Sequence, residues 1–141
     1  MRNEVALIYG RIKNKVRNML YELFLWKYGF GNRVSKVTWE KQFSSGSWAH
    51  LFNPQESAHY TSIARMVKNQ DLSVKILDVG CGQGVLYGYL QKDNQSINYL
   101  GIDISNEAIS QAKEKFKGKR FQNLDFENNT ISEKFDIIIF N

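Results

Sequence analysis

The sequence is short of the residues that build covalent or metal cross-links, because its 141 residues include one cysteine and two histidines. The single cysteine, Cys81, excludes an internal disulfide framework and any zinc site that needs three or four cysteines. His50 and His59 stand nine residues apart, which is not the spacing of zinc ligands, so we expect no metal site. Hydrophobic residues make up 43% of the chain, which is typical of a packed domain and not of a disordered protein.

Long apolar runs are also lacking. The longest, residues 19–26, is interrupted by Glu22 and is far too short to span a bilayer. The sequence has no apolar segment followed by a small-residue cleavage site, so we expect no secretory signal. Together with the single cysteine, these absences predict a cytoplasmic protein.

Charge divides the chain into two regions. Residues 1–41 hold nine Lys and Arg against three Asp and Glu, whereas residues 42–141 hold ten against eleven. The length suits one ordinary domain. We therefore predict a basic, aromatic helical extension or cap over residues 1–53 and one globular domain over residues 54–141, with the only proline, Pro54, at the boundary.

Within the extension, apolar residues recur at steps of three and four over residues 4–27, which predicts an amphipathic helix. Three interpretations of this basic helix stay open. It packs on the domain or in a homodimer interface, it makes a peripheral contact with an anionic membrane, or it contacts nucleic acid. The near-neutral charge of the rest of the chain disfavours a nucleic-acid partner. Residues 33–53 are predicted to be irregular.

The globular region alternates strands with helices. Strands are predicted at residues 74–79, 99–103, 121–124 and 135–140, and helices at residues 54–68, 85–92 and 105–116. Asn53 is expected to cap the first of these helices, with Pro54 in its first position, and Ser105 is expected to cap the third. The alternation predicts right-handed βαβ units and a mostly parallel α/β sheet.

A glycine-rich loop joins the first predicted strand to the helix that follows, with the sequence Asp78-Val79-Gly80-Cys81-Gly82-Gln83-Gly84. Glycines in this position permit a tight turn and a close approach of the backbone to a ligand. The dinucleotide pattern G-x-G-x-x-G requires a small residue where Val85 stands, which disfavours nicotinamide or flavin binding. The phosphate-binding pattern G-x-x-x-x-G-K-[ST] is absent.

Two acids follow neighbouring strands. Asp103 ends the second predicted strand, and Asp125 follows the third. A carboxylate in the first position can accept two hydrogen bonds from a ribose diol, and one in the second can accept from the exocyclic amine of adenine. The next residues, Ile104 and Phe126, are expected to hold the adenine ring between apolar groups.

Taken together, residues 74–84, 99–105, 125–126 and 135–141 resemble the class I S-adenosylmethionine-dependent methyltransferases. The resemblance implies a Rossmann-like, mostly parallel sheet with flanking helices, and S-adenosyl-L-methionine as the cofactor. The glycine loop would contact the methionine part, which carries no phosphate, in agreement with the lack of Lys and Arg there. The implied cofactor-binding residues are Asp78, Gly80, Cys81, Gly82, Gln83, Gly84, Asp103, Ile104, Asp125 and Phe126.

The sequence departs from this family after its fourth predicted strand, where it stops at Asn141. The family's sheet has further strands. We therefore expect a truncated chain, or a sheet that a partner chain completes, and the activity of these residues alone is doubtful on that expectation. An edge as apolar as residues 137–139 is expected to be covered.

The resemblance implies methyl transfer to a small-molecule, glycan or lipid-linked acceptor. A non-catalytic cofactor-binding or scaffolding module, and a nucleic-acid methyltransferase, stay open as alternatives. No catalytic residue is identified, although His50 and His59 are the candidates for a general base at neutral pH. Cys81 is interpreted as a small buried thiol. The aromatic segment 39–60 is expected to cap the site and to contact the substrate.

Overall fold

A computed structural model of the chain describes residues 16, 19, 20, 34–68, 70, 73–92 and 97–140. The chain divides into two compact units, residues 1–35 and 36–141. The helix predicted for residues 4–27 lies almost entirely outside the described residues, although the three described positions within it are helical. No helix of the described residues is both long and apolar enough to cross a membrane.

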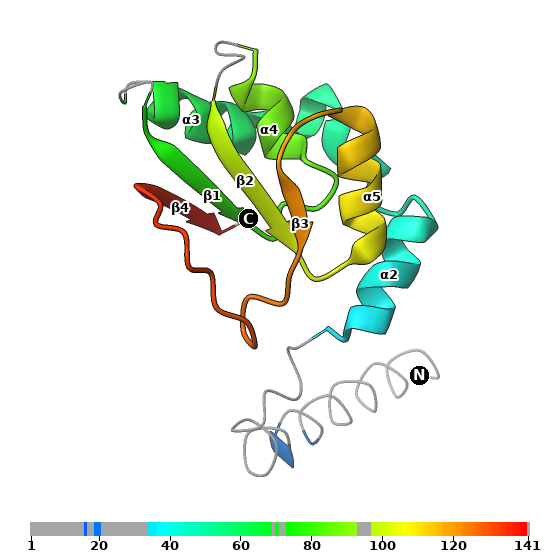
Figure 1. The fold of residues 1–141 in the computed structure, drawn as a ribbon. Coiled ribbons are helices and arrows are strands. Elements are labelled where there is room, and N and C mark those ends of the chain that lie inside the picture. The colour runs from blue at the N-terminus through cyan, green and yellow to red at the C-terminus, as the bar shows by residue number, and fades with distance from the viewer. Residues whose placement is uncertain are drawn as a thin grey trace. The chain divides into compact units, whose positions relative to one another are not determined.

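The second unit is built on a parallel four-stranded sheet (Figure 1). Its strands are β1 (Lys75–Val79), β2 (Asn98–Asp103), β3 (Phe121–Asn123) and β4 (Ile137–Phe140), in the order β3-β2-β1-β4. In the centre of the register, Leu77 of β1 pairs with Leu100 of β2 and with Ile138 of β4. The predicted α/β class and all four predicted strands are therefore confirmed, with bounds that differ by one or two residues.

Helices α3 (Ser57–Lys68), α4 (Val85–Leu90) and α5 (Asn106–Lys115) correspond to the three predicted helices. Asn53 does not cap the first of them with its side chain. Residues Pro54–Glu56 instead form a 3-10 turn, η4, in which Pro54 takes the first position and the Glu56 N–H donates to the Asn53 carbonyl at 3.0 Å. The tighter turn delays the start of α3 to Ser57. The Ser105 cap is confirmed, because its Oγ accepts from the Ala108 N–H at 3.1 Å.

The prediction of irregular structure over residues 33–53 is wrong for much of that segment. It contains helix α2 (Lys36–Ser44) and a 3-10 turn, η3 (Ala49–Phe52). The structure also divides the chain differently from the predicted regions 1–53 and 54–141, because it groups residues 36–53 with the sheet. The physical reason is that α2 packs beside α5 (Figure 1) and bonds to it through Glu40.

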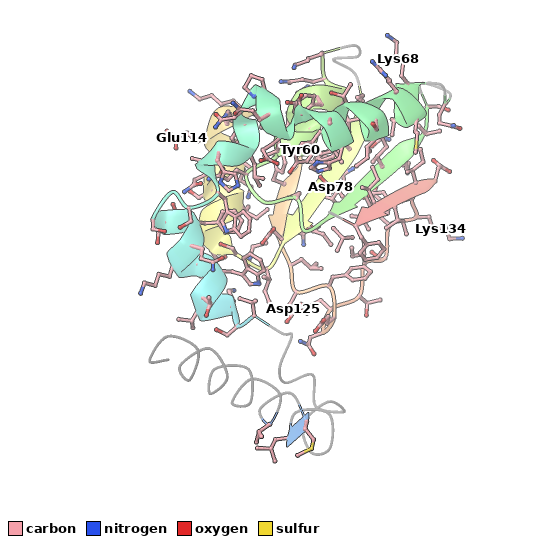
Figure 2. The ribbon with its side chains drawn as sticks, turned by 180° about the vertical axis from the view of Figure 1, so that it is seen from behind. Tyr60, Lys68, Asp78, Glu114, Asp125 and Lys134 are labelled. Carbon is pink, nitrogen blue, oxygen red and sulfur yellow. The ribbon has the colours of Figure 1, made fainter. Side chains whose placement is uncertain are left out.

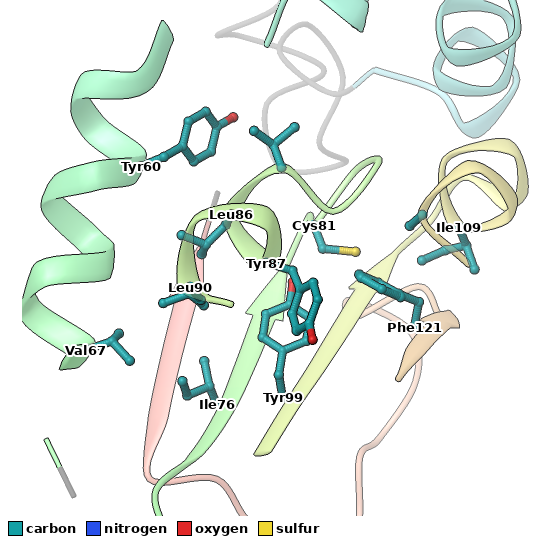
Figure 3. Packing of buried hydrophobic residues seen from close by; sticks show 12 residues of the cluster. Tyr60, Val67, Ile76, Cys81, Leu86, Tyr87, Leu90, Tyr99, Ile109 and Phe121 are labelled. Carbon is teal, nitrogen blue, oxygen red and sulfur yellow. The ribbon is translucent and has the colours of Figure 1, made fainter. Parts of the chain in front are cut away.

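The two faces of the sheet bury different clusters. On one face, α3, α4 and α5 pack over side chains from three strands (Figure 3), among them Ile76, Tyr99 and Phe121. On the opposite face, Leu77, Leu100 and Ile102 form a smaller cluster with Val79, Leu124, Ile131 and Phe135. Residues 124–136, which hold neither helix nor strand, supply three members of this second cluster. On the same face of β4, Ile138 and Phe140 are 52% and 69% exposed.

Candidate functional site

The glycine loop between β1 and α4 places its backbone at the carboxyl end of the sheet. Gly80, Gly82 and Gly84 have φ of +78°, +52° and +78°, a conformation that other residues adopt only with strain. The Gly80 and Cys81 N–H groups both donate to the Ile102 carbonyl of β2, at 2.9 and 3.0 Å. The loop is therefore fastened to the end of the neighbouring strand, where open α/β sheets bind ligands.

Asp103, at the end of β2, joins this loop to the next one. Its Oδ2 accepts from the Gly82 N–H at 2.9 Å, and its Oδ1 accepts from the Ser105 N–H at 2.8 Å. Burial raises the pKa of the Asp103 carboxyl, although the hydrogen bonds from Ser105 and Gly82 oppose that effect. Each carboxylate oxygen has a second lone pair, so the group retains the capacity to accept from a ligand diol.

Three other predicted residues of the loop are buried. Asp78 is 0% exposed, and one of its oxygens accepts from the Tyr99 hydroxyl at 2.6 Å. Cys81 is 3% exposed, and burial raises the pKa of its thiol well above the ordinary value. Gln83 donates through Nε2 to Oε1 of Gln111 on α5. These side chains fix the shape of the loop from beneath, which leaves the backbone of Gly80 and Gly82 as the part that a ligand can approach.

The buried charge of Asp78 also affects the pKa values of two tyrosines. Figure 2 shows it close to Tyr60 of α3. Burial, and next the charge of Asp78, raise the pKa of Tyr60, and the same two causes raise the pKa of Tyr99 well above its usual range. Both phenols therefore stay neutral at physiological pH, and Tyr99 stays a hydrogen-bond donor to the carboxylate.

Two of the residues predicted to hold adenine, Asp125 and Phe126, lie after β3 and are more exposed, whereas Ile104 follows β2. Asp125 accepts from the Glu127 N–H at 3.1 Å and from Nδ2 of Asn128 at 2.7 Å, which makes a local turn. Phe126 is 41% exposed and meets Phe140 edge to face, with ring centroids 5.6 Å apart. Ile104 follows Asp103 and is half-buried. All the predicted cofactor residues thus belong to the carboxyl ends of β1, β2 and β3 or to the loops that follow.

Sequence reasoning missed Glu40 of α2, which bonds to the first turn of α5. Phe43 belongs to the aromatic segment 39–60 that is expected to cap the site, and its ring is buried against Gly82. The aromatic composition pointed to a cap but did not predict that contact. No local pattern marks Glu40, because its partners lie 65 to 67 residues further along the chain.

The two candidate histidines lie apart from the loop to different degrees. His50 stacks on Trp48 with ring centroids 6.0 Å apart, and Trp48 in turn lies 6.3 Å from Phe43. His59 is exposed on α3, with its ring beside that of Tyr60. His50 is therefore joined to the loop through an aromatic cluster, whereas His59 adjoins Tyr60, on which the buried charge of Asp78 acts. Within the described ranges, no group of three or more His, Cys, Asp and Glu side chains could hold a metal ion.

Several known methyltransferases are similar to this chain in sequence. A family model described as a methyltransferase domain matches residues 70–141, half of the chain. A curated relative, malonyl-[acyl-carrier protein] O-methyltransferase of Bacillus cereus, is 26% identical over 114 residues, which are 77% of this chain and 42% of that protein. Other matching relatives are named as tRNA and ribosomal-protein methyltransferases. The chain spans less than half the length of each of these relatives.

Solved structures of methyltransferases are also similar to this chain. The plantazolicin methyltransferase BamL, crystallised with a triazolic desmethylPZN analogue and SAH (S-adenosylhomocysteine), is 32% identical with a TM-score of 0.56, over 73% of this chain and 42% of that one. A TehB-like SAM-dependent methyltransferase of Corynebacterium glutamicum is 30% identical with a TM-score of 0.58, over 76% of this chain and 56% of that one. The chain therefore belongs to the methyltransferase domain family, and its predicted resemblance to the class I S-adenosylmethionine-dependent enzymes is confirmed.

Proposed function

We propose that this chain binds S-adenosylmethionine at the carboxyl ends of β1, β2 and β3 and belongs to a protein that transfers its methyl group to an acceptor. The observation that carries the proposal is the placement of Asp103. Its carboxylate bridges the Gly82 and Ser105 backbone amides at 2.9 and 2.8 Å, so it stands fixed between the glycine loop and the start of α5. A fixed carboxylate beside the glycine loop suits a ribose diol.

The donor set of the site fits this cofactor. No Lys or Arg occurs in the loop over residues 78–84, and the cofactor has no phosphate that would need one. The half-buried Gly82 would offer backbone to the methionine part, and the half-buried Asp125 would accept from an adenine amine. Phe126 adds an exposed ring beside that acid. Because Asp78 is fully buried beneath the loop, its role in the proposal is to position the loop through Tyr99 and not to touch the ligand.

The chemistry is a displacement at carbon. When bound, the cofactor supplies a methyl group on a positively charged sulfur, a leaving group that is already activated. The residues of this chain would hold the methyl group in place and exclude water. Correct orientation of the reacting groups is worth about 7–11 kcal/mol of the activation barrier in favourable cases. An acceptor oxygen or nitrogen would bond to the methyl carbon as the bond from that carbon to sulfur breaks, the electron pair would stay on the departing neutral thioether, and the acceptor's proton would go to a base. His50 is the candidate that the aromatic cluster joins to the site.

For the acceptor, we propose a small molecule, a glycan or a lipid-linked group. The near-equal numbers of acidic and basic residues over 42–141 support this class, because nucleic-acid binding draws on clustered positive charge. The homodimer and membrane contacts considered for residues 4–27 depend on residues outside the described part of the chain. We propose a reducing cytoplasmic setting, which the buried free thiol of Cys81 suits.

The test is a calorimetric titration of the purified chain with S-adenosylhomocysteine and, separately, with NAD. We expect binding of the first alone, and we expect Asp103→Ala to raise its Kd at least tenfold, or ~1.4 kcal/mol. The matched control is Asp136→Ala, because Asp136 also accepts from a backbone amide, that of Lys75 at 2.8 Å, but at the amino end of β1. A folded wild-type chain that does not bind, or equal weakening in both variants, would overturn the proposal.

The alternatives have their own outcomes in the same set of experiments. A chain that binds S-adenosylhomocysteine but, within its full-length protein, transfers no methyl group to any acceptor would support the non-catalytic module. Tight binding to RNA or DNA that weakens steeply with added salt would support a nucleic-acid acceptor.

A further inference from the structure

One carboxylate of α2 accepts three hydrogen bonds from the start of α5. Oε1 of Glu40 accepts from the Asn106 N–H at 2.7 Å, and Oε2 accepts from the Glu107 N–H at 2.9 Å and from the Ser105 hydroxyl at 2.7 Å. The first backbone amides of a helix have no partner within the helix, and the helix dipole favours a negative charge beside them. The side chain of Glu40 therefore fastens α2 to the N-terminus of α5.

Ser105 connects this attachment to Asp103. Ser105 is fully buried, and its Oγ donates to Glu40 while it accepts from the Ala108 N–H. Its backbone N–H donates to Asp103. Asp103 thus bonds to the backbone of Ser105, and Glu40 bonds to its side chain. Asp103 is held by backbone amides, whereas Glu40 supplies the charged contact of α2 with the start of α5.

The attachment sets where Phe43 lies. Phe43 follows Glu40 by three residues on the same helix, and its ring faces Gly82: a Cβ on that glycine would lie 3.5 Å from Cζ of the ring. The Phe43 carbonyl also accepts from Nε2 of Gln111 at 3.2 Å, and Gln111 bonds to Gln83 of the loop. The ring therefore covers the glycine whose backbone the cofactor would approach.

We infer that Glu40 is a positioning residue of the cofactor site, which acts by holding α2 so that Phe43 covers Gly82 and encloses the methionine part of the ligand. The inference rests on the proposed function. The two parts of the ligand are affected differently. Without Glu40, the ribose contact Asp103 keeps its backbone partners. Phe43, in contrast, loses its position over the methionine part. Loss of Glu40 should therefore act on the amino-acid part of the ligand and spare the nucleoside part.

The test compares two probes, S-adenosylhomocysteine and 5′-methylthioadenosine, which keeps the nucleoside but lacks the amino-acid part. For Glu40→Gln, we expect the Kd of the first to rise about tenfold, equivalent to ~1.4 kcal/mol, and that of the second to stay within about twofold. Glu114→Gln is the matched control, because it removes the same charge from an exposed position on α5. That control should bind both probes as the wild type does.

A second variant, Phe43→Leu, keeps Glu40 and removes the ring over Gly82, so it tests the same idea if Glu40→Gln fails to fold. It should show the same selective loss. Equal weakening of both probes in either folded variant, or unchanged binding of S-adenosylhomocysteine, would overturn the inference. A folded wild-type chain that binds neither probe would instead overturn the proposed function, so the two failures are distinguishable.

Discussion

The two halves of the candidate site are built in opposite ways. Along β1 and β2, the side chains are buried and bond across the fold: Asp103 reaches Gly82, and Tyr99 reaches Asp78, each 21 residues away. After β3, the acid bonds only to its own turn, since the partners of Asp125 lie two and three residues along the chain. The first half is part of the core, and the second is part of the surface.

This difference predicts which residues contribute to both ligand affinity and the stability of the fold, and which contribute to affinity alone. A substitution in the β1–β2 half leaves buried amides or closely packed atoms without their partners, so it should lower the free energy of unfolding as well as ligand affinity. A substitution in the β3 half should alter affinity alone. The following expectations test the contrast, from the largest effect on stability to the smallest.

The largest effect is expected for Gly101→Ala, directly beneath the glycine loop. A Cβ at this position would lie 2.8 Å from Cδ1 of Phe121 and 2.9 Å from Sγ of Cys81, both of which are buried. We expect the free energy of unfolding to fall by about 3 kcal/mol, the upper end for overpacked cores. Urea denaturation measures it. Adding Cys81→Ala should restore part of the loss, and no restoration in the double variant would contradict the packing explanation.

Asp103→Ala is expected to rank second. It leaves the Gly82 and Ser105 amides without the acceptor they share, at a cost of about 2 kcal/mol for buried unpaired groups. Thermal unfolding should register this loss in the absence of any ligand. If the melting temperature does not change, the bridge between the two loops does not stabilise the fold, and the contrast between the halves fails.

Glu40 should give a smaller effect that depends on pH. Burial acts to raise the pKa of its carboxyl, but the hydrogen bonds from Glu107, Ser105 and Asn106 outweigh it, so the pKa lies below its ordinary 4.5. A lowered pKa contributes stability above pH 4.5 that is lost as the pH falls through the folded-state value. A charge at a helix N-terminus contributes ~0.3–1 kcal/mol. Glu40→Gln should therefore be less stable than the wild type at pH 7, with a difference that shrinks on acidification.

The reference for that measurement is the wild type at each pH, because Asp103 titrates with the opposite sign. Its pKa is raised mainly by burial, so its protonation on acidification favours the folded state in both proteins, although the charge of Glu40 contributes to the raised value. Subtracting the two stability curves from denaturation at several pH values therefore leaves the titration of Glu40 together with its effect on Asp103. A difference that grows toward low pH would contradict the assignment.

Asp125→Ala should have the smallest effect on stability. Its bonds are local and its neighbours 126–130 are exposed, so we expect a change within about 0.5 kcal/mol. Under the proposed function, the same variant should still weaken S-adenosylhomocysteine several-fold, by loss of an adenine contact. Calorimetry and thermal unfolding of one sample measure both. A large loss of stability would show that the β3 half is as structural as the other.

The sequence predicted the parts of the fold whose causes are local. The strand–glycine–helix order, the Ser105 cap and the alternation of strands follow from neighbouring residues, and the structure confirms them. Helix α2 was missed because it is held by contacts with α5 and the loop, far along the chain. The roles of Asp103 and Asp125 toward a ligand stay predictions, but their different burial could not be predicted, since one bond of Asp103 spans 21 residues.

The position of Cys81 allows the opening of the glycine loop to be followed by the rate of thiol labelling. The chain has one thiol, it lies within the glycine loop at 3% exposure, and its pKa is raised by burial. A thiol reagent can react only during excursions that expose the loop, so the labelling rate counts those openings. Under the proposed function, a bound ligand that holds the loop closed would slow the reaction, so the labelling rate of Cys81 would measure occupancy without an added probe.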